Sequence, residues 1–137
     1  MRHAHAEWPG YSGGDFDRPL TARGLADAVT SARAIRAEGL VPDSLLVSPA
    51  RRTRQTAEIV ARELGLPSTA LHFEDALYNA TASTLARELQ RRTAGGRVLL
   101  VAHNPGISAL ARQLSGDPDR PPLAPADWDS FALPSEA

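Results

Sequence analysis

Residues 97–106 read RVLLVAHNPG, and this stretch decides the fold. Its first six residues, 97–102, form a short apolar run of the kind found in strands that are buried on both faces. The next four residues, 103–106, contain a proline and a glycine, and from there we predict a helix that runs through Leu114. A buried strand that leads at once into a helix is the repeating unit of parallel α/β sheets.

The same pattern occurs earlier in the chain. Residues 44–47 (SLLV) are a second buried-strand candidate, and Ser48-Pro49 follows as a cap residue and a proline suited to the first helical turn. The helix predicted from there ends near Leu64, where Gly65 closes it. Two strand–helix units of this type indicate right-handed crossovers between parallel strands.

The remaining elements fit between and around these units. Thr21 is suited to cap a helix that Gly39 ends, and its apolar stripe comprises Leu25, Ala28, Val29, Ala32 and Ile35. We predict a short strand over residues 70–73, a helix from Thr81 to Thr93, and a turn at Gly95-Gly96. Residues 7–20 read as a polar loop, and residues 116–137 as a loop-rich tail with a strand remnant at Phe131 to Leu133.

These elements predict an α/β fold, in which a mostly parallel central sheet has helices on both faces in a three-layer sandwich. With 137 residues, a single domain over residues 1–137 is the expectation. Ligands bind such sheets beyond the carboxyl ends of the strands. Polar residues gather there in two segments, 48–52 and 103–104, and Arg2-His3 is a third if it also follows a strand.

Composition narrows the function. The net charge is −1, which argues against bulk electrostatic binding to nucleic acid or membranes. The chain has no cysteine, so disulfides and thiolate chemistry are excluded, and all 15 basic residues are arginine. No apolar run is long enough for a membrane span or a signal peptide, so we expect a cytoplasmic protein.

Two histidines and several arginines suit chemistry on a phosphoryl group. Arginine guanidiniums neutralise and orient phosphoryl oxygens, and a neutral histidine is a competent nucleophile. The candidates are Arg2, His3, Arg18, His103 and the arginines of the helix that follows Ser48. Arg51 and Arg54 share one side of that helix whereas Arg52 points about 100° away, so at most one or two of the three face the site. The arginines supply positive charge, and we therefore expect neither a metal nor a cofactor.

The order of four motifs resembles the histidine phosphatase superfamily. RHAHA opens the chain at residue 2, DRPLTARG begins at residue 17, SPARRTRQTAE at residue 48 and VAHNPG at residue 101. The chain is most similar to the SixA-type phosphohistidine phosphatases of that superfamily. This resemblance spans nearly the whole chain and implies a phosphoglycerate mutase-like fold.

The resemblance also implies a role for each site residue. His3 is the expected nucleophile that becomes phosphorylated, and Arg2 beside it is an expected phosphate ligand. Arg52 matches the arginine four residues after the motif's serine, and His103 matches the second catalytic histidine. Arg18, which matches a SixA-type position near the phosphate, and Asn104 are expected to bind substrate.

The chain departs from the family in its proton donor. Many members carry a carboxylate shortly after the third strand or directly after the second histidine, but here those places read ALYN (76–79) and Asn104. Glu74 and Asp75 lie a few residues early, and we interpret them as solvated loop residues. An alkoxide leaving group needs an acid, whereas a phosphoimidazole ring leaves more easily, so the phosphoryl donor is expected to be phosphohistidine on a phosphorylated protein.

A second departure concerns the strands at both ends. Family members have an apolar strand before Arg-His, whereas here only Met1 stands before Arg2. We therefore expect the first strand to be missing and His3 to lose its rigid mount, and we expect the last strand to be shortened.

Three alternatives remain open. In the first, the protein is a catalytically impaired relic that still binds phosphate. In the second, it is a phosphatase for small phosphorylated metabolites. In the third, His3 and His5 form a metal site with His72 or His103.

Overall fold

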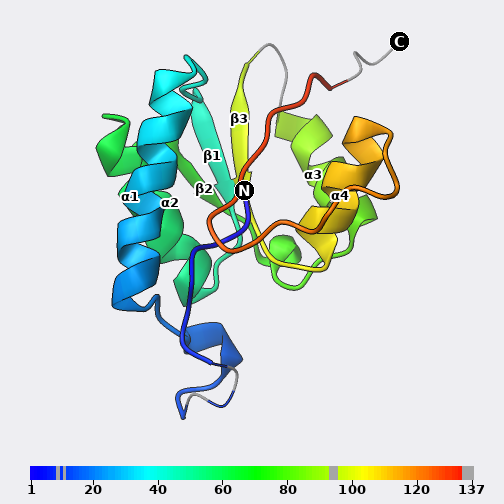
Figure 1. Cartoon of the computed structure of the whole chain (residues 1–137). Helices are drawn as coiled ribbons and strands as arrows, with labels where there is room; N and C mark the ends of the chain where they lie inside the picture. Colours follow the sequence, from blue (N-terminus) through cyan, green and yellow to red (C-terminus); the bar gives the residue numbers. More distant parts are fainter. Residues whose placement is uncertain (9, 11, 93–95, 134–137) are drawn as a thin grey trace.

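A sheet of three parallel strands forms the centre of the structure, a computed structural model that describes residues 1–133 except 9, 11 and 93–95. The strands β1 (Ser44–Val47), β2 (Leu71–Phe73) and β3 (Val98–Val101) are arranged in the order β2-β1-β3. β1 is central and pairs on one side with β2, where Leu46 is opposite His72, and on the other with β3, where Leu46 is opposite Leu100. The strands run side by side in Figure 1.

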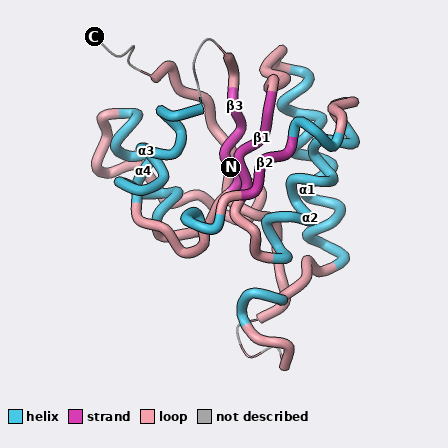
Figure 2. The backbone as a smooth tube through the Cα atoms, turned by 180° about the vertical axis from the view of Figure 1, so that it is seen from behind, coloured by secondary structure: helices cyan, strands magenta, loops and turns pink. Residues whose placement is uncertain are grey.

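Helices cover both faces of this sheet. α1 (Ala22–Ala37) and α2 (Arg51–Glu63) lie on one face, and α3 (Ala82–Arg92) and α4 (Gly106–Ser115) lie on the other (Figures 1 and 2). Three short 3₁₀ helices complete the described elements: η1 (Asp15–Asp17), η2 (Ser68–Ala70) and η3 (Asp75–Leu77). The predicted α/β three-layer architecture is confirmed.

The alternation of side chains along the strands explains this layering. Leu45 and Val47 of β1 point into the apolar cluster beneath α1 and α2, whereas Leu46 between them points into the cluster beneath α3 and α4. In β3, Val101 points into the cluster beneath α1 and α2, and Leu100 points into the cluster beneath α3 and α4. Both faces are apolar, which is why the two strands read as continuous hydrophobic runs rather than alternating ones.

The start of the chain lies against the free edge of β3. Arg2 forms a parallel bridge with Ala102, the backbone N–H of His3 donates to the Ala102 carbonyl at 3.1 Å, and the Met1 amino group donates to the Leu100 carbonyl at 2.8 Å. On its outer side, the Arg2 N–H donates to the carbonyl of Asp127 in the tail. The expectation that His3 lacks a rigid mount is therefore wrong, because hydrogen bonds on two sides hold this short segment.

Beyond Met1, the same edge of β3 borders an apolar groove with a volume of about 1100 Å³. Leu99 and Leu110 lie on its walls, and Trp128 and Phe131 of the tail also line it. The described part of the tail, residues 116–133, contains no strand, so the predicted remnant at Phe131 to Leu133 is wrong. In its place, this part of the tail packs as loop against the two apolar clusters.

Most element boundaries follow their local signals. The Thr21 hydroxyl accepts from the Gly24 N–H at 3.1 Å and caps α1 as predicted, and Gly39 beyond its end has the left-handed φ of 70°. α2 begins at Arg51 with Ala50 as its N-cap, so the cap predicted at Ser48 is wrong. The predicted helix end at Thr93 and the Gly95 of the predicted turn lie outside the described residues. Within the described ranges, no helix is long and apolar enough to span a membrane.

Candidate active site

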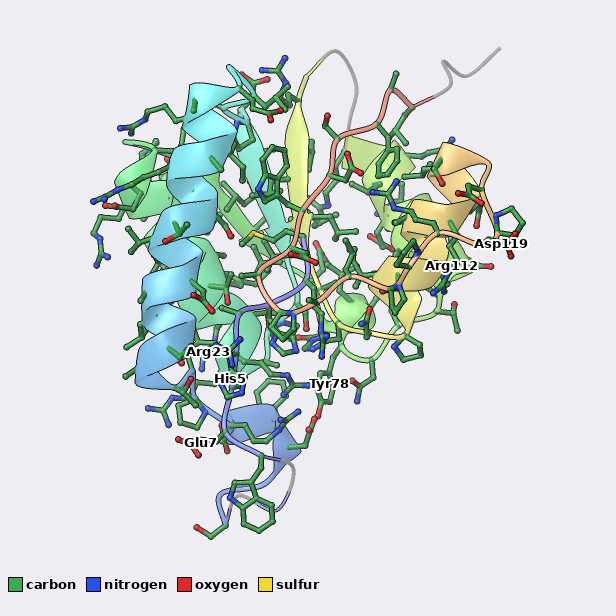
Figure 3. The ribbon with its side chains drawn as sticks, viewed as in Figure 1. His5, Glu7, Arg23, Tyr78, Arg112 and Asp119 are labelled. Carbon is green, nitrogen blue, oxygen red and sulfur yellow. The ribbon has the colours of Figure 1, made fainter. Side chains whose placement is uncertain are left out.

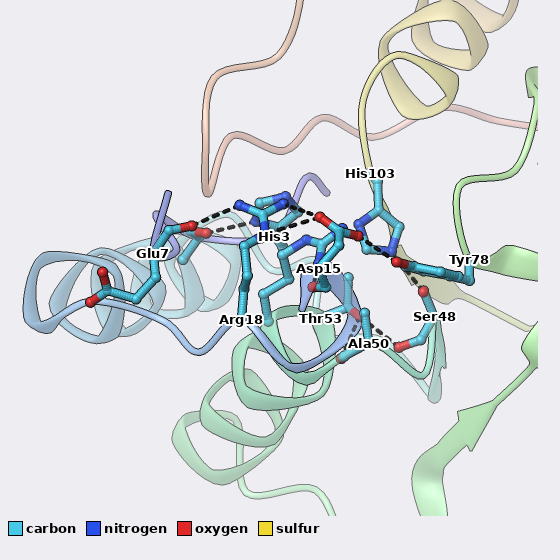
Figure 4. A network of polar contacts seen from close by, with 11 residues as sticks. His3, Glu7, Asp15, Arg18, Ser48, Ala50, Thr53, Tyr78 and His103 are labelled. Atoms are coloured by element: carbon cyan, nitrogen blue, oxygen red, sulfur yellow. Dashed lines mark hydrogen bonds and ion pairs between the residues drawn. The ribbon is translucent and has the colours of Figure 1, made fainter. Parts of the chain in front are cut away.

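Three segments meet where the strands end at their carboxyl edge. His103 follows β3, Ser48 follows β1, and His3 lies beside them because its segment runs parallel to β3. A cleft of about 640 Å³ opens at this edge. All six residues predicted for the site line it, namely Arg2, His3, Arg18, Arg52, His103 and Asn104. Figure 4 shows the polar contacts at its centre.

His3 is held in a form that suits a nucleophile. Its ring is buried, with 7% of the residue exposed, and Nδ1 lies 2.7 Å from the Ala4 carbonyl oxygen. A carbonyl only accepts, so Nδ1 carries the proton and Nε2 keeps its lone pair. Burial, with a smaller contribution from the charges of Arg52 and Arg2, lowers the pKa of His3 to about 4. The ring is therefore neutral at physiological pH.

His103 faces His3 across the cleft, with 5.5 Å between the ring centroids. Its Nε2 lies 2.7 Å from the Ser48 hydroxyl oxygen, while Nδ1 is buried and has no hydrogen-bond partner among the described residues. Burial and the charge of Arg52 lower the pKa of His103 to about 3. Ser48 thus fixes the orientation of the ring.

Arg52 supplies a buried positive charge. It is the second residue of α2 and only 2% exposed, whereas its neighbours Arg51 and Arg54 on the same helix are exposed, as the helical geometry predicted. Its Nη1 donates to the Asp15 carbonyl at 2.7 Å, and its Nη2 is 3.2 Å from the Asp15 carboxylate.

The other predicted residues differ in what they contact. Arg18 pairs with the Asp15 carboxylate at 2.8 Å and donates to the Glu7 carbonyl at 2.7 Å. Arg2 Nη1 donates to the Leu123 carbonyl at 3.1 Å, and its Nε is buried with no partner among the described residues. The Asn104 amide donates to the same carbonyl at 2.9 Å, so it ties the tail to the site as well as lining the cleft.

Close packing explains why a glycine, Gly106, ends the HNPG motif. A Cβ at Gly106 would lie 2.0 Å from the Ala80 carbonyl oxygen, so only glycine lets α4 begin this close to the loop before α3. The Asn104–Pro105 peptide bond in the same motif is cis. His103 directly precedes this turn and lines the cleft.

Sequence reasoning missed two residues of the site and assigned the wrong role to a third. Asp15 lies between Arg18 and Arg52, Tyr78 donates a hydrogen bond to the Asp15 carboxylate, and Ser48, predicted as a helix cap, holds His103 instead. Tyr78 also stands edge-on to His103 with 5.7 Å between centroids. Figure 3 shows Tyr78 and His5 at the lower end of the sheet. Asp15 begins the three-residue 3₁₀ helix η1 within the segment predicted as a polar loop, and no periodic signal in the sequence marked it.

The carboxylates considered from sequence do not belong to the cleft. Glu74 forms an ion pair with Arg92, and Asp75 is exposed in η3. His5 binds the Thr21 hydroxyl through Nδ1 at 2.8 Å, and His72 is exposed on β2. Across the described ranges, no three histidine, aspartate or glutamate side chains approach closely enough to hold a metal ion.

Comparison with known proteins identifies the family. The model of the histidine phosphatase superfamily (branch 1) matches residues 1–79, which contain three of the four motifs and four of the six site residues. The chain belongs to this superfamily. The predicted resemblance is thereby confirmed, and with it the assignment of the phosphoglycerate mutase-like fold to this chain.

SixA-type members are among its similar proteins. The chain is 31% identical over 116 residues to the phosphohistidine phosphatase SixA of Escherichia coli, covering 83% of this chain and 71% of the relative. A solved structure of the protein histidine phosphatase SixA with tungstate superposes with a TM-score of 0.75 at 30% identity, covering 91% of this chain and 79% of the other. An uncharacterized chloroplastic protein of Arabidopsis thaliana is 32% identical over 125 residues. That match covers 85% of this chain but only 57% of the longer plant protein.

Proposed function

We propose that this protein is a phosphatase that removes a phosphoryl group through a covalent intermediate on His3. The observation that supports this most directly is the hydrogen bond from Nδ1 of His3 to the Ala4 carbonyl. Because this bond keeps the proton on Nδ1, the lone pair of Nε2 is free to attack phosphorus. The ring centroids of His3 and His103 are 5.5 Å apart, and the buried guanidinium of Arg52 lines the same cleft. A nucleophile, a second imidazole and a fixed cation are the groups that a phosphoryl transfer requires.

The reaction proceeds in two steps. Nε2 of His3 attacks phosphorus, the P–N bond forms as the bond to the leaving group breaks, and the ring becomes an N-phosphoimidazolium. Water then attacks the same phosphorus, the P–N bond breaks, and inorganic phosphate leaves with His3 neutral again. Arg2, Arg18 and Arg52 neutralise the phosphoryl oxygens in both steps, and the imidazole of His103 lies beside the same group. In this proposal guanidiniums supply the charge, so neither step requires a metal.

We propose phosphohistidine on a phosphorylated protein as the substrate. The SixA relatives act on phosphohistidine according to their names, and their similarity extends over more than four-fifths of this chain. The surroundings of the cleft suit a protein surface, because Trp8 is 69% exposed and Phe16 is 40% exposed next to it. Exposed aromatic side chains are frequent at protein-binding surfaces.

A phosphotransfer domain carrying phosphohistidine tests the proposal. Incubation with the wild-type protein should release inorganic phosphate and leave acid-labile, alkali-stable phosphate on the enzyme during turnover. His3→Ala should abolish both signals, while His72→Ala, a histidine substitution outside the cleft, should leave both unchanged. Equal turnover by His3→Ala contradicts the mechanism, and oxyanion binding without any phosphoenzyme in the wild type supports the relic instead.

A further inference from the structure

A phosphatase of this kind needs a group that handles the proton of the leaving group. When an alkoxide leaves, it requires a proton, and when water attacks the phosphoenzyme, a proton must be accepted. The family's usual carboxylate positions are occupied here by uncharged residues, as the sequence showed. Among the described residues, two that carry a carboxylate line the cleft, Glu7 and Asp15. Glu7 contacts Arg18 through its backbone carbonyl, and Figure 4 shows its carboxylate turned away.

The Asp15 carboxylate, in contrast, sits among the charged groups of the site. One oxygen is 2.8 Å from Nη2 and 3.0 Å from Nε of Arg18, and the other is 3.2 Å from Nη2 of Arg52 and accepts the Tyr78 hydroxyl. A phosphoryl group bound by the two arginines would take the same donors, so its oxygens would lie next to this carboxylate. Asp15 is thus within reach of both an incoming substrate and the water that replaces its leaving group.

We propose that Asp15 is the general acid and general base of the reaction. In the first step the protonated carboxyl gives its proton to the leaving atom as the P–N bond to His3 forms and the bond to the leaving group breaks. In the second step the carboxylate takes a proton from the attacking water as the O–P bond forms and the P–N bond breaks. The two transfers cancel over one turnover, so Asp15 ends as it began. The inference rests on the proposed phosphoenzyme and extends it to alkoxide leaving groups.

The change of protonation follows from what substrate does to the neighbours of Asp15. Burial is the largest single influence and raises the pKa of Asp15, but the Tyr78 hydrogen bond and the charges of Arg52 and Arg18 together outweigh it and hold this pKa at about 2. A phosphoryl group takes over the guanidinium charge and brings its own negative charge close to the carboxylate. Both changes favour the protonated form, as in paired carboxylates that share one site.

The exposure of the Asp15 side chain allows its carboxylate to make room for substrate. Asp15 is partly exposed, with 43% of its side chain accessible, so it can move toward the mouth of the cleft while the arginines bind substrate. Tyr78, which donates to it and lies 5.1 Å from Phe16 of the same loop, is a positioning residue.

The geometry also allows a simpler role, in which Asp15 only occupies the anion position until substrate displaces it. The two roles differ in what Asp15→Asn does to different leaving groups. Loss of an acid slows a poor leaving group far more than a good one, because a good leaving group departs without a proton. If Asp15 only fills the anion position, its replacement changes the binding of every phosphate ester by the same factor.

The test compares kcat/KM for phenyl phosphate, which has the poorer leaving group, with that for p-nitrophenyl phosphate. Because kcat/KM covers only steps up to formation of the phosphoenzyme, it isolates the acid role. Asp15→Asn should lose about 100-fold on phenyl phosphate and less than about 5-fold on p-nitrophenyl phosphate. Asp17→Asn is the matched control, an exposed aspartate of the same loop, and should behave as the wild type. Asp15→Glu, which keeps a carboxyl, should recover part of the phenyl phosphate activity.

The base role has its own readout. With p-nitrophenyl phosphate, Asp15→Asn should accumulate more acid-labile phosphoenzyme than the wild type, because hydrolysis of the intermediate lacks its base. If Asp15→Asn changes kcat/KM by the same factor on both esters, in either direction, the proposal is overturned. That failure is distinct from failure of the proposed function, which appears as a wild type that forms no phosphoenzyme or as an active His3→Ala.

Discussion

Replacing His103 with glutamine should make the fold less sensitive to acid. Burial and Arg52 lower the pKa of His103 from 6.5 to about 3, so between these values the unfolded chain binds a proton that the folded chain does not. The folded state is therefore not penalised by His103 above pH 6.5, and the free energy of unfolding decreases as the pH falls below that value. At pH 5 the unfolded pKa lies 1.5 units above the solution pH, which corresponds to a loss of about 2 kcal/mol relative to pH 7.5.

Glutamine is the suitable replacement because its amide nitrogen can take the place of Nε2 and keep the hydrogen bond to the Ser48 hydroxyl. The free energy of unfolding in urea, measured at pH 7.5 and pH 5 without phosphate, should fall by about 2 kcal/mol less in His103→Gln than in the wild type. His72→Gln, on an exposed histidine, should fall as the wild type does. Equal losses in His103→Gln and the wild type would refute the claim that the site holds this imidazole neutral.

Three further outcomes concern turnover and ligand binding. The kcat/KM for p-nitrophenyl phosphate should fall when the pH drops through about 4, the lowered pKa of His3, because protonation of Nε2 removes its lone pair; an acid limb near 6.5 contradicts the burial argument. Ser48→Ala, which removes the 2.7 Å contact to His103, should lower kcat about tenfold at unchanged KM, and an unchanged kcat speaks against an orienting role. Tungstate at 100 times its Kd should stabilise the wild type by about 2.7 kcal/mol in thermal unfolding, whereas Arg52→Lys at the same concentration should show little of this gain, because an ammonium offers no planar pair of N–H donors.

Two strands of the sheet, β1 and β3, were predictable from sequence because both faces of the sheet are apolar along them. SLLV and VLLV therefore read as continuous apolar runs, and Gly39 and Gly65 mark the ends of the helices before and after β1 in the chain. Local signals failed where distant contacts decide the outcome. Ser48 has the chemistry of a helix cap, but the imidazole of His103 competes for its hydroxyl, so α2 begins at Arg51 instead.

The predicted site residues share one cleft because strand ends converge, a property that depends on topology rather than on side-chain detail. Asp15 could not be found in this way. It reaches the arginines through a glycine-containing loop whose path depends on Tyr78 and Arg52, both remote in sequence. The role of Arg18 was predicted by its motif, whereas its contact with the Glu7 carbonyl emerged only in three dimensions.

The position of Met1 links the apolar groove to the proposed nucleophile. Its nitrogen is hydrogen bonded to the Leu100 carbonyl at the mouth of the apolar groove, only two residues from His3. A substitution in the groove that loosens Met1 from β3 therefore reaches His3, the proposed nucleophile, through the backbone. Variants of the groove should be assayed for phosphoenzyme formation as well as for stability.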